Sequence, residues 1–264
     1  MEASIQGVGL LGPGLAGWPA SREILAGNRP WQNEPVGRLN APGLPRTEAR
    51  RATRATHLAL STASEALSTA PNHATEHLAS VWAAADSDLQ GLEKNMRTLA
   101  EDPPWISPHQ FQNSVHNAPA GYWSIASGCR GPATALAAGE ESFAAGLVEA
   151  LTFLASGEEH ALLVAYEEAS PPLLEQSRPL PFSFSVALLL GQPGQRGAAV
   201  TLSVGARRAP TACRTPELET LRHQSPAARS LPLLEALAGG PAAKGGIELS
   251  WGDHSLNLSI GAAP

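Results

Sequence analysis

Short apolar runs alternate with longer segments of helical spacing along this chain, and that alternation limits the folds open to it. Runs such as Ala3 to Leu10, Leu78 to Ala85 and His160 to Tyr166 have the length and bounding residues of buried strands. Between them, apolar residues recur at intervals of three and four, the spacing of one helix face. Strands that alternate with helices predict a layered α/β fold.

The same patterns predict where the remaining elements begin and end. Helices are expected over Arg46 to Ala70, from a cap at Asp86 or Ser87 to about Ala100, over Asn117 to Ala126, over Gly139 to Ser156 and over Ser230 to Ala238. Further strands are expected at Pro132 to Ala138, in a hairpin pair of Phe182 to Leu190 with Ala198 to Gly205, and in a hairpin over Ile247 to Ile260 that turns at Gly252. Trp31 to Pro45 and Trp105 to Ser114 are expected to be irregular.

Composition and charge exclude several classes of protein. Of the 264 residues, 43% are hydrophobic, enough for a core, and 16% are charged, against roughly 25% in an average soluble domain. No apolar run reaches the roughly 18 residues of a membrane span, and the first residues lack the basic start of a signal peptide. A net charge of −6 without a basic cluster argues against nucleic acid as a partner. The two cysteines, Cys129 and Cys213, fit a reducing compartment, so we expect a cytoplasmic protein.

Two short motifs match binding-site patterns but lack the context that such sites need. Residues 7–12 contain a GxGxxG, but the Gly and Pro residues at positions 13–19 leave no place for the helix that would hold a pyrophosphate, so a plain turn is expected. Residues 73–77 read HATEH, which matches the HxxEH of a zinc protease. They lie between a helix and a strand rather than on a helix, so a surface loop is expected. We therefore expect no cofactor and no metal.

The predicted strand, turn and helix around Gly139 carry the most chemical information. Many α/β enzymes place a nucleophile at such a helix N-terminus, because its dipole and free N–H groups favour negative charge. Here the helix opens with Glu140, Glu141 and Ser142. Two carboxylates there stabilise the helix by about 0.3–1 kcal/mol each, and no GxSxG surrounds Ser142. Cys129, in a turn with no neighbouring His, is expected to be a buried apolar residue.

Several segments, taken in their order, resemble β-ketoacyl synthases. They are Arg50 to Leu67, similar to the family's first long helix; Leu92 to Leu99 and Ile106 to Gly121, similar to the approach to its dimer interface; Arg130-Gly131-Pro132, similar to the Lys/Arg-Gly-Pro before its nucleophile strand; and Arg178-Pro179-Leu180 followed by Val186 to Leu190. The resemblance covers roughly residues 3–205. It implies a thiolase-like half-fold, α-β-α in layers on a mixed sheet, that lacks most of the family's C-terminal half.

Two departures from the family decide the function that the resemblance implies. Counted from Arg130-Gly131-Pro132, the position of the active-site Cys holds Glu140, and a carboxylate there cannot run the family's thioester exchange. The family's two catalytic His motifs do not occur, and the surroundings of His254 do not match them. The chain is therefore expected not to be an enzyme on its own. Glu140 is expected to fill the former nucleophile pocket, where it caps the helix or positions a group of a partner.

This combination resembles the chain-length-factor subunits that pair with an active ketosynthase, in particular the short ketosynthase-like proteins of aryl polyene and xanthomonadin-type clusters. The resemblance implies a heterodimer with a Cys-containing ketosynthase, a role in shaping its acyl tunnel, and only indirect contact with acyl carrier protein. The sparse charge fits a surface that another subunit covers. The residues expected at the partner interface and tunnel are Phe111, Gln112, Asn113, Val115, His116, Trp123, Ala133, Thr134, Ala135 and Leu136.

The sequence also predicts how the chain is divided, and it leaves two other functions open. Residues 1–206 are expected to form the ketosynthase-like domain, and residues 207–264 a C-terminal extension whose helix and hairpin pack on it. One rival is a malonyl-carrier-protein decarboxylase that makes a starter unit, which needs oxyanion donors or His side chains that the sequence does not reveal. The other is a stand-alone scaffold with a degenerate thiolase fold, which would form a stable homodimer.

Overall fold

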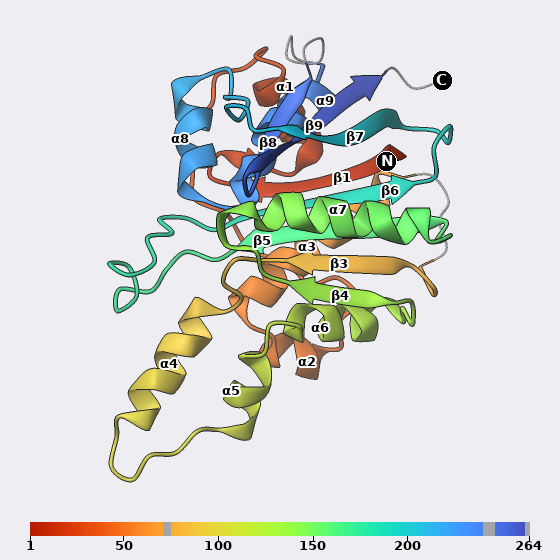
Figure 1. Ribbon diagram of the computed structural model, residues 1–264. Helices are drawn as coiled ribbons and strands as arrows, with labels where there is room; N and C mark the ends of the chain where they lie inside the picture. The colour runs from red at the N-terminus through yellow and green to blue at the C-terminus, as the bar shows by residue number, and fades with distance from the viewer. Residues whose placement is uncertain (71–74, 240–245, 262–264) are drawn as a thin grey trace.

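A mixed sheet lies between layers of helices in the computed structural model of the chain, which describes residues 1–70, 75–239 and 246–261 (Figure 1). The strands in these residues are β1 (Glu2–Gly12), β2 (Leu15–Ala16), β3 (Ala79–Ala83), β4 (Ala133–Leu136), β5 (His160–Glu167), β6 (Phe184–Gly191), β7 (Ala198–Ala206), β8 (Ile247–Trp251) and β9 (His254–Gly261). They form one sheet in the order β4-β3-β5-β6-β1-β7-β9-β8, with β2 paired to β1. β3 runs parallel to β4 and β5, and the other pairs are antiparallel. The predicted layered α/β fold is confirmed.

Helices pack on both faces of the sheet. They are α1 (Trp18–Leu25), α2 (Arg46–Arg51), α3 (Arg54–Ser68), α4 (Leu89–Leu99), α5 (Pro108–Asn113), α6 (Ala118–Ser127), α7 (Ser142–Ala155), α8 (Pro216–Gln224) and α9 (Leu231–Leu237), with 3-10 turns at Gly139–Glu141 and Ala227–Ser230. α7 covers one face and α3 the other (Figure 1). In β5, Leu163 belongs to the core under α7, whereas its neighbours Leu162 and Val164 belong to the core under α3. The central strand is therefore buried on both faces, which explains its continuous apolar sequence.

The glycines of the GxGxxG lie inside β1, under α3, and form no turn. A Cβ built on Gly7 would lie 2.0 Å from the carbonyl oxygen of Ala66, and one built on Gly9 would lie 2.0 Å from that of Thr62. The glycines thus let the helix approach the strand closely. The chain turns directly after the motif, at Pro13 and Gly14 between β1 and β2, so the strand runs two residues beyond the predicted Leu10.

A helix also begins where the sequence analysis expects none. Gly17 has a φ of 91° and precedes α1, and Pro19 occupies its first turn. A positive φ suits Gly, and proline is tolerated in the first helical turn because the N–H that it lacks has no partner there. The Gly and Pro residues that argued against a helix therefore form its start.

Three other predicted boundaries are corrected. The helix expected over Arg46 to Ala70 is two helices, because Ala52 is extended and Thr53 caps α3 by accepting a hydrogen bond from the Thr56 N–H at 3.3 Å. The cap of α4 is Asp88, which accepts from the Gly91 N–H at 3.0 Å. The stretch Trp105 to Ser114, expected to be irregular, contains α5.

The predicted hairpin of β6 with β7 is wrong. β1 lies between them: its residues 4–11 pair with β6 along one edge of the strand, and its residues 2–5 pair with β7 along the other edge. The C-terminal hairpin of β8 with β9, turning at Gly252, is confirmed, and β9 continues the sheet on β7. Residues of the C-terminal segment, among them Leu231, Leu233 and Leu234, are fully buried in the same core as β1 and α7.

Two findings on the described residues bear on function classes. None of the helices there is long and apolar enough to cross a membrane. No cluster of potential metal ligands occurs in those residues. His73, the first residue of the HxxEH motif, lies outside them.

Candidate functional site

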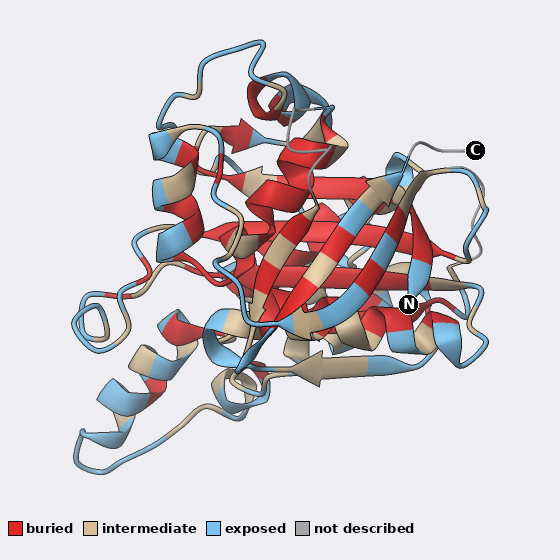
Figure 2. Ribbon diagram, turned by 45° about the horizontal axis from the view of Figure 1, so that its top comes forward, coloured by how far each residue is buried: buried red, intermediate tan, exposed pale blue. Residues whose placement is uncertain are grey.

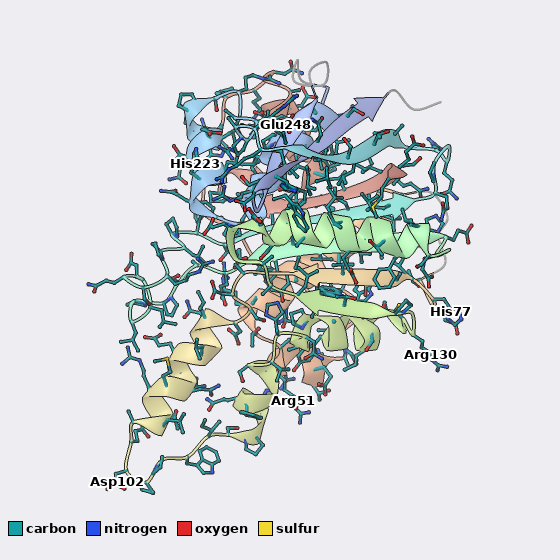
Figure 3. The ribbon with its side chains drawn as sticks, viewed as in Figure 1. Arg51, His77, Asp102, Arg130, His223 and Glu248 are labelled. Carbon is teal, nitrogen blue, oxygen red and sulfur yellow. The ribbon has the colours of Figure 1, made fainter. Side chains whose placement is uncertain are left out.

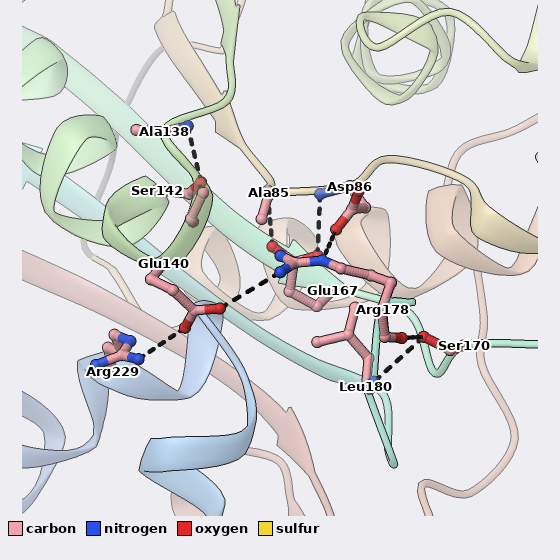
Figure 4. Close-up of polar contacts among 11 residues, drawn as sticks. Ala85, Asp86, Ala138, Glu140, Ser142, Glu167, Ser170, Arg178, Leu180 and Arg229 are labelled. Carbon is pink, nitrogen blue, oxygen red and sulfur yellow. Dashed lines mark hydrogen bonds and ion pairs between the residues drawn. The ribbon is translucent and has the colours of Figure 1, made fainter. Parts of the chain in front are cut away.

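Glu140 lies in the 3-10 turn that joins β4 to α7, and two arginines hold it (Figure 4). Its carboxylate accepts a hydrogen bond from Arg229 Nη2 at 2.7 Å and one from Arg178 Nη1 at 3.4 Å. Arg178 comes from the loop between β5 and β6, and Arg229 from the 3-10 turn before α9. Glu140, which we expect at the nucleophile position from the count along the sequence, thus forms a charged bridge between two distant parts of the chain.

The neighbours of Glu140 are also engaged. Ser142 is buried; its Oγ accepts from the Ala138 N–H at 3.0 Å and donates to the Gly139 carbonyl at 2.8 Å, so it closes the turn. Glu141 accepts from the Gly252 N–H at 2.9 Å, at the tip of the β8–β9 hairpin. Neither side chain is placed as a free nucleophile, and both Glu140 and Glu141 tie this turn to residues after 207.

Behind Glu140 there is almost no free space. The cavity there has a volume of about 10 Å³ and is closed by side chains that include Phe143, Arg222, Arg229 and Leu249. That is close to the minimum room for one water molecule, and an acyl group with its carrier arm is many times larger. On the outer side of Glu140, a groove of about 460 Å³ runs past Arg178 and His223.

A second carboxylate, that of Glu167, lies close to Arg178 and is linked to it through Asp86. Glu167 is fully buried at the end of β5 and accepts from the backbone N–H groups of Ala85 and, at 3.3 Å, Asp86. Arg178 Nε in turn donates to the side chain of Asp86. Burial raises the pKa of Glu167 to about 8; the two backbone hydrogen bonds oppose this rise, the Asp86 charge adds to it, and the Arg178 charge opposes it. Glu168 is also buried, and burial with the Asp88 charge raises its pKa to about 7 against the opposing charge of Arg54.

The two edges of the sheet differ in how they are covered. At one edge, the segment before α8 bonds β8: the Thr211 N–H donates to the Glu248 carbonyl, and the Glu248 N–H donates to Thr211 Oγ1, both at 2.9 Å. At the other edge, β4 pairs with β3 alone among the described strands. An open edge offers N–H and C=O groups to a strand of another chain.

The direction of the free backbone groups on β4 follows from its bonds to β3. The carbonyls of Pro132 and Leu136 accept from the N–H groups of Ser80 and Ala84 at 2.9 and 3.1 Å. Backbone groups of successive strand residues point to opposite sides. The N–H and C=O of Ala133 and Ala135 therefore point away from the sheet.

Next to this edge, α4 and α5 form an arm that projects from the body, with Asp102 near its tip (Figures 1 and 3). Much of its surface is exposed (Figure 2). Apolar side chains that are at least two-fifths exposed gather in this region: Leu92, Met96, Leu99, Trp105, Phe111 and Val115. We call this set the apolar arm surface. Exposed apolar patches of this kind mark interaction sites.

The residues predicted for the partner interface fall into two groups. Exposed or half-buried around the arm and edge are Phe111, Gln112, Val115, His116, Ala133, Thr134, Ala135 and Leu136. His116 connects the two surfaces, since its Nε2 lies 2.9 Å from the Leu136 carbonyl oxygen. Asn113 is buried, where it donates to the Arg51 carbonyl at 2.8 Å and accepts from the Tyr122 hydroxyl at 3.0 Å.

Trp123 has no surface to offer a partner. It is 4% exposed and packs against Trp82, with ring centroids 6.0 Å apart. α6 turns this side chain toward the sheet because the apolar core under α3 lies on that side. Contrary to expectation, Trp123 therefore has almost no exposed area to contribute to a partner interface.

Sequence reasoning missed two parts of the site. Arg229 carries no local signal, since nothing in its surroundings indicates that it reaches Glu140 across 89 positions. The apolar face of α4 did have a signal: Leu92, Met96 and Leu99 recur at helical spacing.

A family model and solved structures both relate the chain to β-ketoacyl synthases. The model of the family described as β-ketoacyl synthase, N-terminal domain, matches residues 20–244. No curated protein matches the chain in sequence. Among solved structures, the fold is similar to a chain of the ketosynthase ApeO in complex with its chain length factor ApeC from Xenorhabdus doucetiae, at a TM-score of 0.73 and 23% identity, over 98% of this chain and 99% of that one.

Two further structures have similar folds. A chain of the ishigamide ketosynthase/chain length factor is similar at a TM-score of 0.71 and 17% identity, over 98% of this chain and 99% of that one. A chain of a type II polyketide synthase complex, AntDE with its acyl carrier protein AntF, is similar at a TM-score of 0.74 and 12% identity, over 99% of each. At these identities the likeness concerns the fold, which is the expected thiolase-like half-fold.

Proposed function

The chain belongs to the β-ketoacyl synthase family, and from that premise we propose that it is a non-catalytic subunit of the chain-length-factor type. It pairs with an active ketosynthase in the cytoplasm and helps to enclose the growing acyl chain of a polyene or polyketide. The observation that carries this proposal is the state of the nucleophile position. Glu140 there is bound by Arg178 and Arg229, and the cavity behind it is about 10 Å³.

The open edge of β4 supports pairing with another chain. Ala133 and Ala135 direct free backbone groups outward, and β4 carries no charged residue, no proline and no bulge, which are the devices that usually protect an edge strand. The apolar arm surface lies beside the same edge, so a partner strand and a partner apolar surface would meet one continuous face. Two of the structures with similar folds are described as complexes of a ketosynthase with its chain length factor.

The indirect role of acyl carrier protein is part of the same proposal. The third similar structure is described as a ketosynthase with its acyl carrier protein. The partner's cysteine would receive the acyl group from the carrier, since this chain has no free nucleophile at Glu140 or Ser142. This chain then contributes walls and contacts to the complex.

Pairing is tested by co-expressing the chain with a ketosynthase from the same gene cluster. We expect a stable one-to-one complex that survives size-exclusion chromatography. Ala135→Pro should abolish it, because proline removes an outward N–H without touching the bonds to β3.

Ala135→Ser is the matched control, because it keeps that N–H and a small side chain, and it should still form the complex. Far-UV circular dichroism of both variants checks that the fold is intact. A wild-type chain that stays unbound beside the ketosynthase would overturn the pairing, and so would a folded Ala135→Pro variant that binds as well as Ala135→Ser.

A further inference from the structure

A partly open hollow lies on the α3 face of the sheet, on the opposite side from α7 and the site at Glu140. It is bounded by the β1–β2 turn, by α3 and by residues 34–42, which we call the strap. Its volume is about 660 Å³. Sites for small molecules in proteins have volumes of roughly 300–1,000 Å³ and mostly apolar walls with a few polar groups.

The two ends of the strap are hydrogen-bonded to the rest of the described chain, whereas its centre is not. At one end, the Gly14 N–H donates to the Glu34 carbonyl at 2.7 Å, and Trp31 Nε1 donates to the Pro13 carbonyl at 2.8 Å. At the other end, the Asn40 N–H donates to Ser61 Oγ at 3.2 Å. Residues 35–39 make no hydrogen bond to the described part of the chain. These anchors hold the two ends of the strap beside the hollow.

Three of the polar side chains that line the hollow, Ser61, Glu65 and Ser68, already have hydrogen-bond partners. The two carboxylate oxygens of Glu65 accept from the N–H groups of Leu10 and Trp18, at 2.8 and 2.7 Å. Ser61 bonds the strap, and Ser68 donates to the Glu65 carbonyl at 2.8 Å. Ser64 Oγ alone among the serines that line the hollow has no partner in the described residues. It is therefore free to bond a ligand.

The walls and the charges define the class of ligand. Leu11, Leu15, Val36 and Leu39 line the space with apolar side chains. Two acidic side chains, Glu34 and Glu65, line it with one basic side chain, Arg38, so the local charge disfavours an anion. The backbone N–H groups already satisfy Glu65, so it offers little to a cation.

We propose that this hollow is a binding site for a small, uncharged, mostly apolar molecule, with Ser64 Oγ as its hydrogen-bond partner. The strap forms one wall of the site, and Val36 and Leu39 contribute its apolar side chains. The proposal rests on the hollow alone and holds whether or not the chain pairs with a ketosynthase.

Two dyes that differ by one charged group test the proposal on the full chain. N-phenyl-1-naphthylamine is uncharged, and 8-anilino-1-naphthalenesulfonate has the same ring system with an added sulfonate. Fluorescence titration should show saturable one-to-one binding of the uncharged dye, and binding of the sulfonate at least about tenfold weaker. Equal affinity for both dyes, or no saturable binding of the uncharged one, would overturn the assignment.

Substitutions that fill the hollow show whether the dye binds there. Ser64→Phe fills the hollow from α3 and Val36→Trp fills it from the strap, and each should weaken binding of the uncharged dye at least about tenfold. The test needs only one of these two variants to fold, and circular dichroism shows which of them does. Phe111→Ser is the control, because it removes apolar area from the arm surface and should leave binding unchanged. Loss in Phe111→Ser with retention in a folded pocket variant would place the dye on the arm and refute the site.

Discussion

At the scale of single residues, the side chain of Glu140 ties two distant parts of the chain together. Its carboxylate is bound to Arg178 and Arg229, and its neighbour Ser142 is bound to the backbone. That Glu140 replaces the nucleophile follows from the count from Arg130-Gly131-Pro132 and stays a prediction. The sequence could not reveal Arg229, because contacts between residues so distant in the chain leave no local pattern.

Restoring a thiol at this position tests whether the residue alone is missing. We expect Glu140→Cys to form no acyl-enzyme with an acyl carrier protein thioester, because the cavity behind residue 140 is about 10 Å³ and the groove on its outer side is too open to enclose an acyl chain. Intact mass spectrometry after incubation measures this, with an active ketosynthase as the positive control. A mass increase equal to the acyl group would show that the pocket is still competent.

Glu167 predicts how stability depends on pH. Burial raises the pKa of its carboxyl to about 8 in the folded chain, from 4.5. The folded state therefore holds the proton more tightly, so the stabilisation is fully present below about pH 4.5 and is lost as the pH rises through about 8. Glu168, with its pKa raised to about 7, acts in the same direction.

Glu167→Gln should reduce this dependence, because an amide oxygen can still accept a backbone N–H and has no proton to lose. We expect the free energy of unfolding of the wild type to fall between pH 5 and pH 8, and that of the variant to fall less. Urea denaturation at the two pH values measures both. Identical slopes would mean that Glu167 is not the group responsible.

At the scale of elements, the contact between α3 and β1 explains the glycines that the sequence left ambiguous. Because a Cβ at Gly7 would lie 2.0 Å from the Ala66 carbonyl oxygen, Gly7→Ala must push the helix away from the strand. We expect it to destabilise the fold by about 1–3 kcal/mol or more.

The matched control for that substitution is Gly205→Ala in β7. Nothing lies within 4 Å of a Cβ at Gly205, so the change in unfolding free energy should stay within about 0.5 kcal/mol. Chemical denaturation of both variants measures the difference. Equal effects at the two glycines would contradict the close packing of α3 on β1.

The elements also mark where sequence reasoning succeeds and fails. β5 and α7 were predictable, because their apolar patterns are long and unbroken. The separation of β6 from β7 was not, since adjacency in sequence favours a hairpin and no local pattern shows that β1 lies between them. α8 was missed although Thr215 and Pro216 form a recognisable helix start, with the Thr215 side chain accepting from the Leu218 N–H.

At the scale of the whole molecule, the asymmetry of the sheet links the fold to the proposed role. The C-terminal segment covers the edge at β8 and bonds the turn at Glu140 and Glu141, whereas the edge at β4 and the apolar arm surface stay open. One end of the molecule is thereby closed by its own chain, and the other presents backbone and apolar groups. The sparse charge of the sequence predicted a surface that a partner covers. The place of such a surface could not be predicted, because it depends on how α4 and α5 project from the body (Figure 2).

The central claim is that this chain supports condensation without performing chemistry, and turnover by the reconstituted pair tests it most directly. Product formed from an acyl primer and malonyl carrier protein is measured with a ketosynthase partner and either the wild-type chain or its Glu140→Gln variant. We predict product at rates within about twofold of each other, and no acetyl product from the chain alone with malonyl carrier protein. An intact complex whose turnover falls by about a hundredfold or more in Glu140→Gln, the loss expected on removing an acid–base group, would contradict the account.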